Sequence, residues 1–219
     1  MNTQDIRQHY LEHRDEIEER LTEFEELRDS SNARWFQELV FVILSSQTSA
    51  EKAWNAAKEL KKTDFLLEGS KDEVAKILAG NEIQYEINKA DYIVENREML
   101  SQPTLTNPEK EMKLKDKVDP DNLDKSRRWL AENMKGMSWK GSSHFLRNIG
   151  YGNGFGIISS HILTNLVQLG AIEHPDQPSN LEEYLEMEEE MQSLADKTDI
   201  DIKALDLVLW SMQTGEIFK

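Results

Sequence analysis

A lysine just after a glycine-containing turn is the side chain in this sequence best placed to act as a nucleophile. Residues 135–151 are KGMSWKGSSHFLRNIGY, and Lys140 lies one turn inside the amphipathic helix expected after Gly136 and Ser138. Backbone N–H groups at such a turn and helix start can hold a phosphate. A lysine beside a phosphate track can act as an amine nucleophile. The same pattern also fits an ordinary connection between two helices with a solvated lysine.

Positive charge is concentrated around this lysine. The chain has 219 residues and a net charge of −16, which argues against broad attraction to nucleic acids or anionic membranes. Residues 125–151, here called the basic segment, contain six basic residues and one acid, Glu132, so their net charge is +5. The basic segment can attract a phosphate backbone, or it can form salt bridges with the acidic N-terminal helix.

Several kinds of site are excluded by what the sequence lacks. Without cysteine, the chain has no disulfide, thiolate nucleophile or cysteine-held metal cluster. His144 and His161 lie 17 positions apart without a carboxylate pattern, so we expect core or capping roles and no metal site. The N-terminus is unlike a signal peptide, and no uncharged apolar run reaches the roughly 20 residues that span a bilayer. We expect a soluble cytoplasmic protein with no membrane partner and no cofactor.

A short polar corner separates two predicted helices in the first half of the chain. Residues 35–44 are apolar almost all round, which predicts a buried helix. Residues 45–50, SSQTSA, follow it, and Thr48 or Ser49 can cap the next helix. The side chain of Gln47 should reach solvent here. This corner can be a plain connection between two helices. Alternatively, it can place Gln47 at a point where a bound ligand is forced apart.

The C-terminal third supplies further candidates. A glycine-rich turn over residues 150–156 leads into a helix whose N-cap we expect to be Ser159. Trp210 lies on a terminal apolar helix, where a tryptophan can be a core residue or a stacking surface. Asp206, one turn earlier, is more readily structural than catalytic. Lys219 is the last residue, and such residues are usually frayed.

Helical periodicity dominates the chain, and no stretch shows the alternation typical of strands. We therefore expect an all-α fold of two lobes. The first lobe covers about residues 31–122, and the second about 123–219, with an N-terminal helix over 5–28 packed against it. Prolines bracket a lysine-rich stretch within residues 101–122, which we expect to be a functional or mobile loop or a lobe junction.

Four segments, in this order, carry a resemblance to a known family. They are LSSQTSA at 44–50, KADYIV at 89–94, the hairpin at 135–151 and the tail from 205 to Lys219. The sequence resembles the helix-hairpin-helix DNA glycosylases, and is most similar to the type-2, archaeal-type 8-oxoguanine DNA glycosylase/AP lyase. The resemblance implies a two-lobed helix-hairpin-helix glycosylase fold and base-excision repair. It also implies binding of double-stranded DNA containing 8-oxoguanine or AP sites, and we expect a monomer.

The resemblance also implies roles for individual residues. Lys140 would be the Schiff-base nucleophile, and Gln47 would fill the gap that an extruded base leaves in DNA. Trp210 and Lys219 would recognise the base, since in the family the last lysine helps to tell 8-oxoguanine from guanine. The residues expected to contact the DNA backbone in the hairpin are Gly136, Ser138 and Gly141.

Two positions depart from the family pattern. The family hairpin usually contains Gly-x-Gly, and its second glycine is here Ser138, so a side chain lies where the backbone approaches DNA. The family's catalytic aspartate, in Ile-Ile-Asp-x-His-Ile-Leu, is here Ser159. Losing one preorganised electrostatic group lowers a rate by on the order of 10²–10³. We therefore expect slowed base excision with persisting AP-lyase activity. The alternative is a protein that binds damaged or AP-site DNA and has residual lyase activity only.

Overall fold

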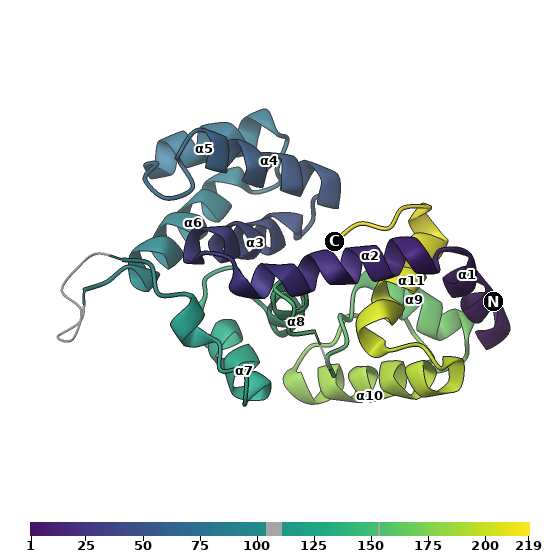
Figure 1. Ribbon diagram of the computed structural model, residues 1–219. Coiled ribbons are helices and arrows are strands. Elements are labelled where there is room, and N and C mark those ends of the chain that lie inside the picture. Colours follow the sequence, from purple (N-terminus) through teal and green to yellow (C-terminus); the bar gives the residue numbers. More distant parts are fainter. Residues whose placement is uncertain (104–110, 153) are drawn as a thin grey trace. The chain divides into compact units, whose positions relative to one another are not determined.

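The computed structural model describes residues 1–103, 111–152 and 154–219, and its regular structure is helical throughout (Figure 1). The all-α prediction is thus confirmed, since these residues contain no strand. Residues 104–110, part of the loop predicted over 101–122, lie outside the described residues. The α-helices are α1 (Thr3–Glu12), α2 (Arg14–Glu26), α3 (Asn32–Ser45), α4 (Ala50–Lys62), α5 (Lys71–Gly80), α6 (Glu86–Leu100), α7 (Leu123–Asn133), α8 (Trp139–Asn148), α9 (Ser160–Gln168), α10 (Leu181–Thr198) and α11 (Ile202–Thr214). Two short 3-10 helices are η1 (Leu27–Asp29) and η2 (Lys115–Lys117).

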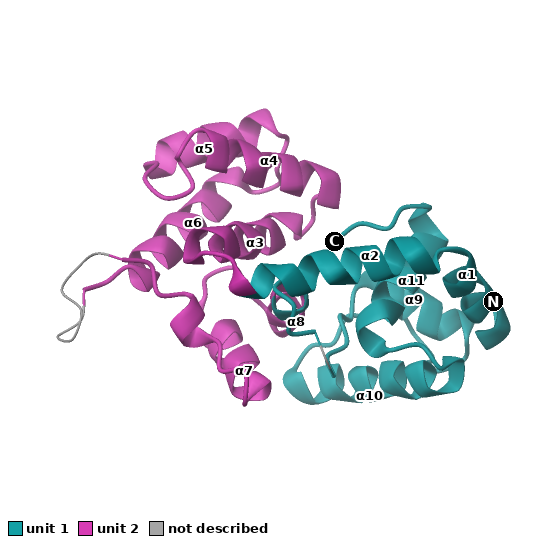
Figure 2. Ribbon diagram, in the orientation of Figure 1, with its two compact units in different colours: residues 1–28, 146–219 teal, residues 29–145 magenta. Residues whose placement is uncertain are grey.

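Contacts between helices divide the chain into two compact units (Figure 2). Unit 1 combines residues 1–28 with residues 146–219, and unit 2 is formed by residues 29–145. The sequence analysis placed a boundary near residue 122, so the two divisions differ over residues 123–145. The reason is that α7 contacts η2, while α6 holds the loop after α7, and both partners precede residue 122 in the chain.

Unit 2 is built around α3. Every residue from Trp35 to Leu44 is buried, which confirms the helix predicted from its apolar composition. The helix begins at a capping serine, Ser31, whose side chain accepts the N–H of Arg34 at 3.2 Å. α4 contacts both α3 and α5, and α6 contacts both α3 and α5. The buried Glu38 carboxylate on α3 forms an ion pair with Arg34 at 2.7 Å, so its charge is compensated.

Unit 1 is centred on α11, which contacts α1, α2, α9 and α10. The turn after α8 also lies close to α2. Gly150 has a φ of +83°, and a Cβ there would lie 2.8 Å from the Cα of Glu25. The Nε of Arg28 donates to the carbonyl of Gly150 at 2.6 Å. Glycine is therefore required at this position both by its left-handed backbone and by the close approach of α2.

The helix predicted over residues 5–28 is divided into α1 and α2, which meet at His13. His13 has a φ of −114° and a ψ of 14°, and its N–H donates to the carbonyls of His9 and Tyr10 at 3.1 and 3.2 Å. Ile6 on α1 and Ile17 on α2 are both fully buried. The change of direction at His13 lets both helices place their apolar side chains in the core of unit 1.

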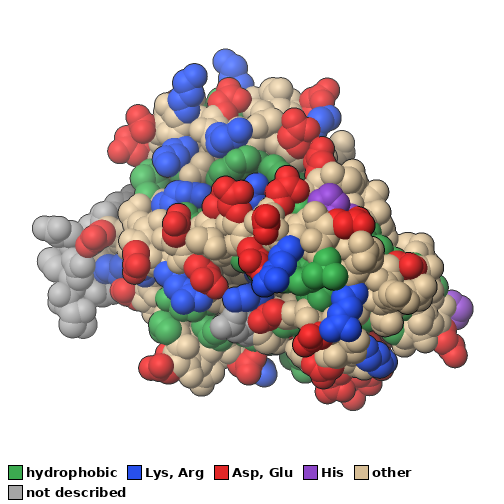
Figure 3. All heavy atoms as spheres, turned by 45° about the vertical axis from the view of Figure 1, so that its right-hand side comes forward, with side chains coloured by type: hydrophobic (Ala, Val, Ile, Leu, Met, Phe, Trp, Pro, Cys, Tyr) green, Lys and Arg blue, Asp and Glu red, His purple; other side chains and the backbone are tan. Residues whose placement is uncertain are grey.

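Acidic and basic side chains are interspersed over the face shown in Figure 3. Two of the large apolar side chains that are exposed, Tyr85 (59%) and Ile87 (65%), lie together at the start of α6. None of the described helices combines the length and the apolar composition that crossing a bilayer requires.

Candidate functional site

The hairpin between α7 and α8 is fixed to α6 by side-chain contacts within unit 2. Asn96 of α6 accepts the N–H of Lys135 at 2.8 Å and donates to its carbonyl at 2.9 Å. Gly136 has a φ of +76°, and a Cβ there would lie 2.7 Å from the ring of Tyr92. A side chain at position 136 would therefore strain the backbone and push the hairpin away from α6.

Ser138 caps the start of α8. Its Oγ accepts the N–H of Gly141 at 3.1 Å, while its carbonyl accepts the N–H of Ser142 at 2.9 Å. Gly141 itself is buried against Val42 of α3. The side chain of Ser138 thus binds one of the N–H groups at the helix start. The N–H groups of Trp139 and Lys140 form no hydrogen bond with the residues that the structure describes, so they remain able to bind an anion.

Lys140 lies in the first turn of α8 and is half-buried. Its ammonium group forms no ion pair or hydrogen bond with the described part of the chain. Burial lowers the pKa of the Lys140 ammonium, because desolvation disfavours the charged form. A lysine must lose its proton before its nitrogen can act as a nucleophile, so this environment favours the reactive form. One turn later, His144 packs edge-on against Phe41, with ring centroids 5.7 Å apart.

The basic segment is less uniformly available than its sequence indicates. Arg127 is buried and stacks on Trp139, with its guanidinium carbon 4.6 Å from the ring centre. Arg147 is also buried, in unit 1, and forms an ion pair with Asp206 at 3.2 Å. The exposed cations of the segment, which form no ion pair with the described residues, are Lys125, Arg128 and Lys135.

The corner between α3 and α4 exposes Gln47 in a left-handed conformation, with a φ of 57°. Lys89 of α6 binds this corner through hydrogen bonds from its ammonium group. Its Nζ donates to the carbonyls of Leu44 and Ser46 at 3.0 and 2.6 Å, and to the Oγ1 of Thr48 at 3.4 Å. Burial lowers the pKa of Lys89 to about 8. The sequence analysis quoted Lys89 only as part of a motif, because a contact across 41 to 45 positions leaves no local signal.

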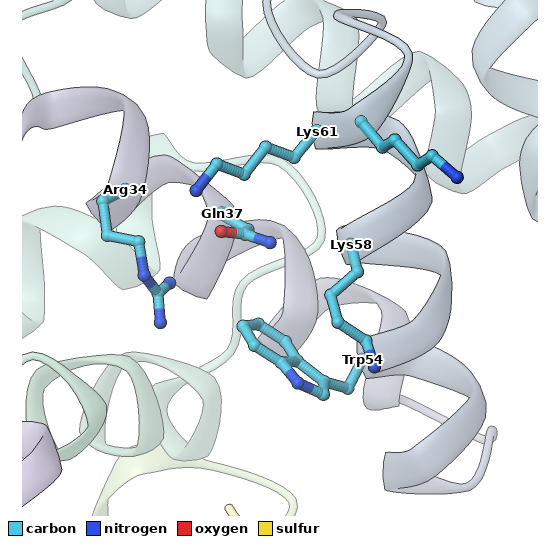
Figure 4. Close-up of a pocket in the computed structure, with 6 residues that line it drawn as sticks. Arg34, Gln37, Trp54, Lys58 and Lys61 are labelled. Atoms are coloured by element: carbon cyan, nitrogen blue, oxygen red, sulfur yellow. The ribbon is translucent and has the colours of Figure 1, made fainter.

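A second basic surface, which the sequence analysis did not identify, lies in unit 2 between α3 and α4 (Figure 4). It surrounds an open hollow of about 470 Å³. Arg34 lies 5.4 Å from the ring centre of Trp54 and is already paired with Glu38. The spacing of three lysines along one face of α4 could have indicated this surface. The lining residues are Arg34, Gln37, Trp54, Lys58, Lys61 and Lys62.

In unit 1, Ser159 caps α9 as predicted. Its Oγ accepts the N–H of Ile162 at 3.3 Å, and its own N–H donates to the carbonyl of Ile157 at 2.8 Å. Its φ of −90° and ψ of 167° are ordinary for a capping residue. Aspartate is an equally good N-cap. The backbone at position 159 therefore suits an aspartate as well as a serine.

Trp210 of α11 is half-buried and packs edge-on against His161 of α9, with ring centroids 4.4 Å apart. The Nδ1 of His161 lies 2.6 Å from the Oε1 of Gln213, whose Nε2 donates to Asn165 at 3.0 Å. The indole N–H of Trp210 is buried and finds no hydrogen-bond partner among the described residues. Trp210 is thus neither a fully enclosed core residue nor an exposed one. His161 has a packing and hydrogen-bonding role.

Asp206 and the chain end complete unit 1. Burial raises the pKa of the Asp206 carboxyl, and the neighbouring Arg147 guanidinium opposes this rise. Because Asp206 is buried against Arg147, its charge already has a partner. α11 ends at Thr214, its C-cap Gly215 has a φ of +78°, and Lys219 beyond it is half-buried.

The residues predicted to form the site are divided between the two units. Unit 2 carries the hairpin, the lysine and the corner, namely Gln47, Gly136, Ser138, Lys140 and Gly141. Unit 1 carries Ser159, Trp210 and Lys219.

Comparisons with known proteins agree with the helical fold and the hairpin. A family described as 8-oxoguanine DNA glycosylase matches residues 17–200. The 8-oxoguanine DNA glycosylase/AP lyase of Fusobacterium nucleatum is 36% identical over 217 residues, which cover 98% of this chain and 96% of that protein. The protein of the same name from Korarchaeum cryptofilum is 35% identical over 207 residues, covering 94% and 91%.

Solved structures give the same result. The crystal structure of Methanocaldococcus jannaschii 8-oxoguanine DNA glycosylase matches with a TM-score of 0.87 and 30% identity, covering 99% of this chain and 95% of that one. A second structure of the glycosylase/lyase from that organism, in complex with a 15mer DNA containing 8-oxoguanine, matches with a TM-score of 0.80 and 31% identity, covering 94% and 93%. The fold is therefore the helix-hairpin-helix glycosylase fold, and the chain belongs to the 8-oxoguanine DNA glycosylase family.

Proposed function

We propose that this protein removes 8-oxoguanine from duplex DNA and cleaves the strand at the resulting AP site, with Lys140 as the nucleophile. The observation that supports this most directly is the pairing of an anchored hairpin with a half-buried lysine in the first turn of α8. Membership of the family and the DNA complex of the M. jannaschii protein give the substrate class. Duplex DNA containing AP sites is the second substrate.

The chemistry begins when the neutral amine of Lys140 attacks C1′ of the damaged nucleotide. The bond between C1′ and the base breaks, and the base leaves with the electron pair and takes up a proton. Loss of a proton from the nitrogen and opening of the sugar ring give a Schiff base. Removal of a proton from C2′ then expels the 3′-phosphate, which nicks the strand. The base must first be extruded from the stack, because its sugar is otherwise shielded.

Several groups of unit 2 would contact the DNA. The N–H groups of Trp139 and Lys140 can bind a backbone phosphate, while the exposed cations of the basic segment add charge attraction. The lysines of the hollow between α3 and α4 offer a further phosphate contact. Gln47, exposed at its corner, would fill the gap left by the extruded base. Such contacts give affinity and position rather than sequence preference.

Ser159 is expected to slow excision of the base more than cleavage of the strand at the AP site. A carboxylate at this helix start would stabilise positive charge developing on the sugar, and a serine cannot do so. An AP site already lacks its base and presents an aldehyde, so Schiff-base formation there needs no base departure. A specific alternative follows from Ser159, namely a protein that binds damaged or AP-site DNA and retains lyase activity only.

Borohydride trapping tests the role of Lys140. The protein would be mixed with duplexes that contain one AP site, and reduction should fix the Schiff base as a covalent adduct. We expect an adduct with the wild type and with Lys135→Ala, which removes an exposed lysine of the same hairpin, and none with Lys140→Ala. An adduct of wild-type yield with Lys140→Ala would overturn the assignment.

The same duplexes with one 8-oxoguanine test Ser159 under single-turnover conditions. Ser159→Asp should excise the base on the order of 10²–10³ times faster than the wild type, because the charge returns to a backbone that already suits it. Binding of both duplexes with cleavage of the AP-site duplex only, by the wild type and by Ser159→Asp alike, would favour the binding alternative. Absence of DNA binding even at low salt would reject both the proposed repair activity and the DNA-binding alternative.

Recognition of the base is assigned to Trp210 and Lys219. Trp210→Phe keeps an aromatic face and should retain excision better than Trp210→Ala. Lys219→Ala should lower the preference for 8-oxoguanine over guanine, measured as the ratio of single-turnover excision rates, while leaving AP-site cleavage unchanged. We further propose that the protein acts as a monomer, which light scattering with and without DNA would test.

A further inference from the structure

Three potential metal ligands converge where α1 meets α2, in a part of the chain that the proposed repair chemistry does not use. His9 and Glu12 lie in the last turn of α1, and His13 forms the junction with α2. One ligand atom from each of the three lies within 4.8 Å of the others. The two imidazole rings have their centroids 4.4 Å apart. The i, i+3, i+4 spacing places all three on one helical face.

A hydrogen bond from another helix prepares His9 as a ligand. Its Nε2 lies 2.8 Å from the Oγ of Ser211 on α11. When Ser211 donates its own hydroxyl proton to the carbonyl of Val208 at 2.9 Å, its oxygen accepts from His9. In that arrangement the imidazole proton is on Nε2, and Nδ1 keeps a free lone pair. Metal-binding histidines are commonly oriented in this way by a partner on the other nitrogen.

His13 and Glu12 are also available. The Nδ1 of His13 lies 3.6 Å from the carboxylate of Glu16, which favours a proton on that nitrogen and a lone pair on Nε2. Glu12 is exposed, and its Oε1 accepts a hydrogen bond from Gln8 at 2.8 Å, which leaves its second oxygen.

We propose that His9, Glu12 and His13 form a site for a divalent transition-metal ion of the zinc type, with water completing the coordination. Two imidazoles and one carboxylate are ligands that Zn²⁺ binds at about 2.0–2.2 Å, so neighbouring ligand atoms should lie about 3.3 Å apart. Side-chain rotations at an exposed surface can close the remaining gap. The ligands carry one negative charge in total, which partly offsets that of the ion.

The site would fix the junction between the first two helices. His9 and Glu12 belong to α1, whereas His13 precedes α2, so one ion would join the two sides of the break. The hydrogen bond to Ser211 connects the same ion to α11, the central helix of unit 1. Binding should therefore stabilise unit 1, and this consequence is independent of whether the protein cleaves DNA.

Metal titration of the purified full-length chain, prepared without a histidine tag, tests the proposal. Zn²⁺ binding would be measured by calorimetry, and Co²⁺ would be used as a spectroscopic probe of tetrahedral nitrogen and oxygen coordination. We expect one ion per chain and a Zn²⁺-dependent rise in melting temperature. His174→Ala, which removes an exposed histidine elsewhere in unit 1, is the matched control and should bind like the wild type.

Three variants separate a built site from adventitious binding. Glu12→Gln and His13→Ala change residues at the surface and should each weaken binding at least 10-fold, with the circular dichroism spectrum unchanged. Ser211→Ala removes the partner of His9 together with the hydrogen bond from Ser211 to Val208, and should weaken metal binding about 10-fold. Wild-type affinity in both His13→Ala and Glu12→Gln, or a stoichiometry well below one, would overturn the proposal.

Discussion

Replacing Lys89 with methionine removes the side chain that holds the Gln47 corner, and its effect on stability should depend strongly on pH. The Lys89 ammonium donates to two carbonyls and one hydroxyl at the end of α3 and the start of α4. Burial lowers its pKa from 10.5 to about 8. Methionine has a similar length and has no proton to lose.

The direction of the pH effect follows from proton linkage. Between pH 8 and 10.5 the unfolded wild type holds a proton on Lys89 that the folded wild type has lost. Stability of the wild type contributed by this residue therefore rises with pH through that window. With these two pKa values, the gain between pH 7 and pH 10 is about 2.5 kcal/mol. Lys89→Met lacks this pH-dependent contribution to the free energy of unfolding, because methionine does not titrate.

Urea denaturation followed by circular dichroism at pH 7 and pH 10 measures the difference. Wild-type stability minus that of Lys89→Met should increase by about 2.5 kcal/mol between the two pH values, because all other titrating groups are common to both proteins. Lys76→Met, which changes an exposed lysine on α5, should show no comparable shift. If the stability difference between the wild type and Lys89→Met does not change with pH, Lys89 is not a buried lysine with a lowered pKa.

The same variant tests the functional importance of the corner. Without Lys89, the carbonyls of Leu44 and Ser46 before Gln47 and the hydroxyl of Thr48 after it lose their shared donor. The left-handed conformation of Gln47 is then less strongly held. We expect binding of AP-site duplex to weaken about 10-fold, which corresponds to about 1.4 kcal/mol. The rate of Schiff-base formation at saturating protein should change little, because Lys140 lies on another element. Equal affinity of both proteins would show that the corner does not contribute to binding.

Three further predictions concern buried charge and helix caps. Arg147→Met leaves Asp206 buried without its partner and should destabilise the protein by about 3–5 kcal/mol in urea denaturation, with most of the loss recovered in Arg147→Met/Asp206→Asn. A loss below about 1 kcal/mol would mean that the pair is solvated. Ser159→Ala should cost about 1 kcal/mol through its lost cap, whereas Ser159→Asp should be nearly neutral in the same assay. Ser138→Gly frees the N–H of Gly141 and should tighten DNA binding severalfold in fluorescence anisotropy, and unchanged affinity would show that this N–H does not reach a phosphate.

Local sequence signals predicted much of the fold. The apolar run from Trp35 to Leu44 predicted a buried helix, and serine before an apolar helix start predicted the cap at Ser159, since both depend on neighbouring residues. The break at His13 could not be predicted in this way. Residues on both sides favour helix and keep an apolar stripe, and the break depends on how each half packs against α11.

The contacts that the sequence did not predict are pairings between residues far apart in the chain. Arg147 counted as part of the positive charge around the hairpin, yet its partner Asp206 lies 59 positions further along the chain. Asn96 binds Lys135 across 39 positions, and neither residue has a property that marks it as a partner of the other. Single-sequence patterns reveal periodicity and caps, but they do not reveal which polar groups meet in the core.

The contacts of Lys89 and Asn96 give α6 the role of a spacer between two parts of unit 2. Lys89 holds the corner that carries Gln47, whereas Asn96 holds the hairpin that leads to Lys140. The two residues are seven positions apart, which is close to two helical turns, so they lie on one face about 10.5 Å apart along the axis. Inserting one residue between them would turn one contact away from its target by about 100°. The separation between the corner that carries Gln47 and the hairpin that leads to Lys140 is thus set by a length of helix.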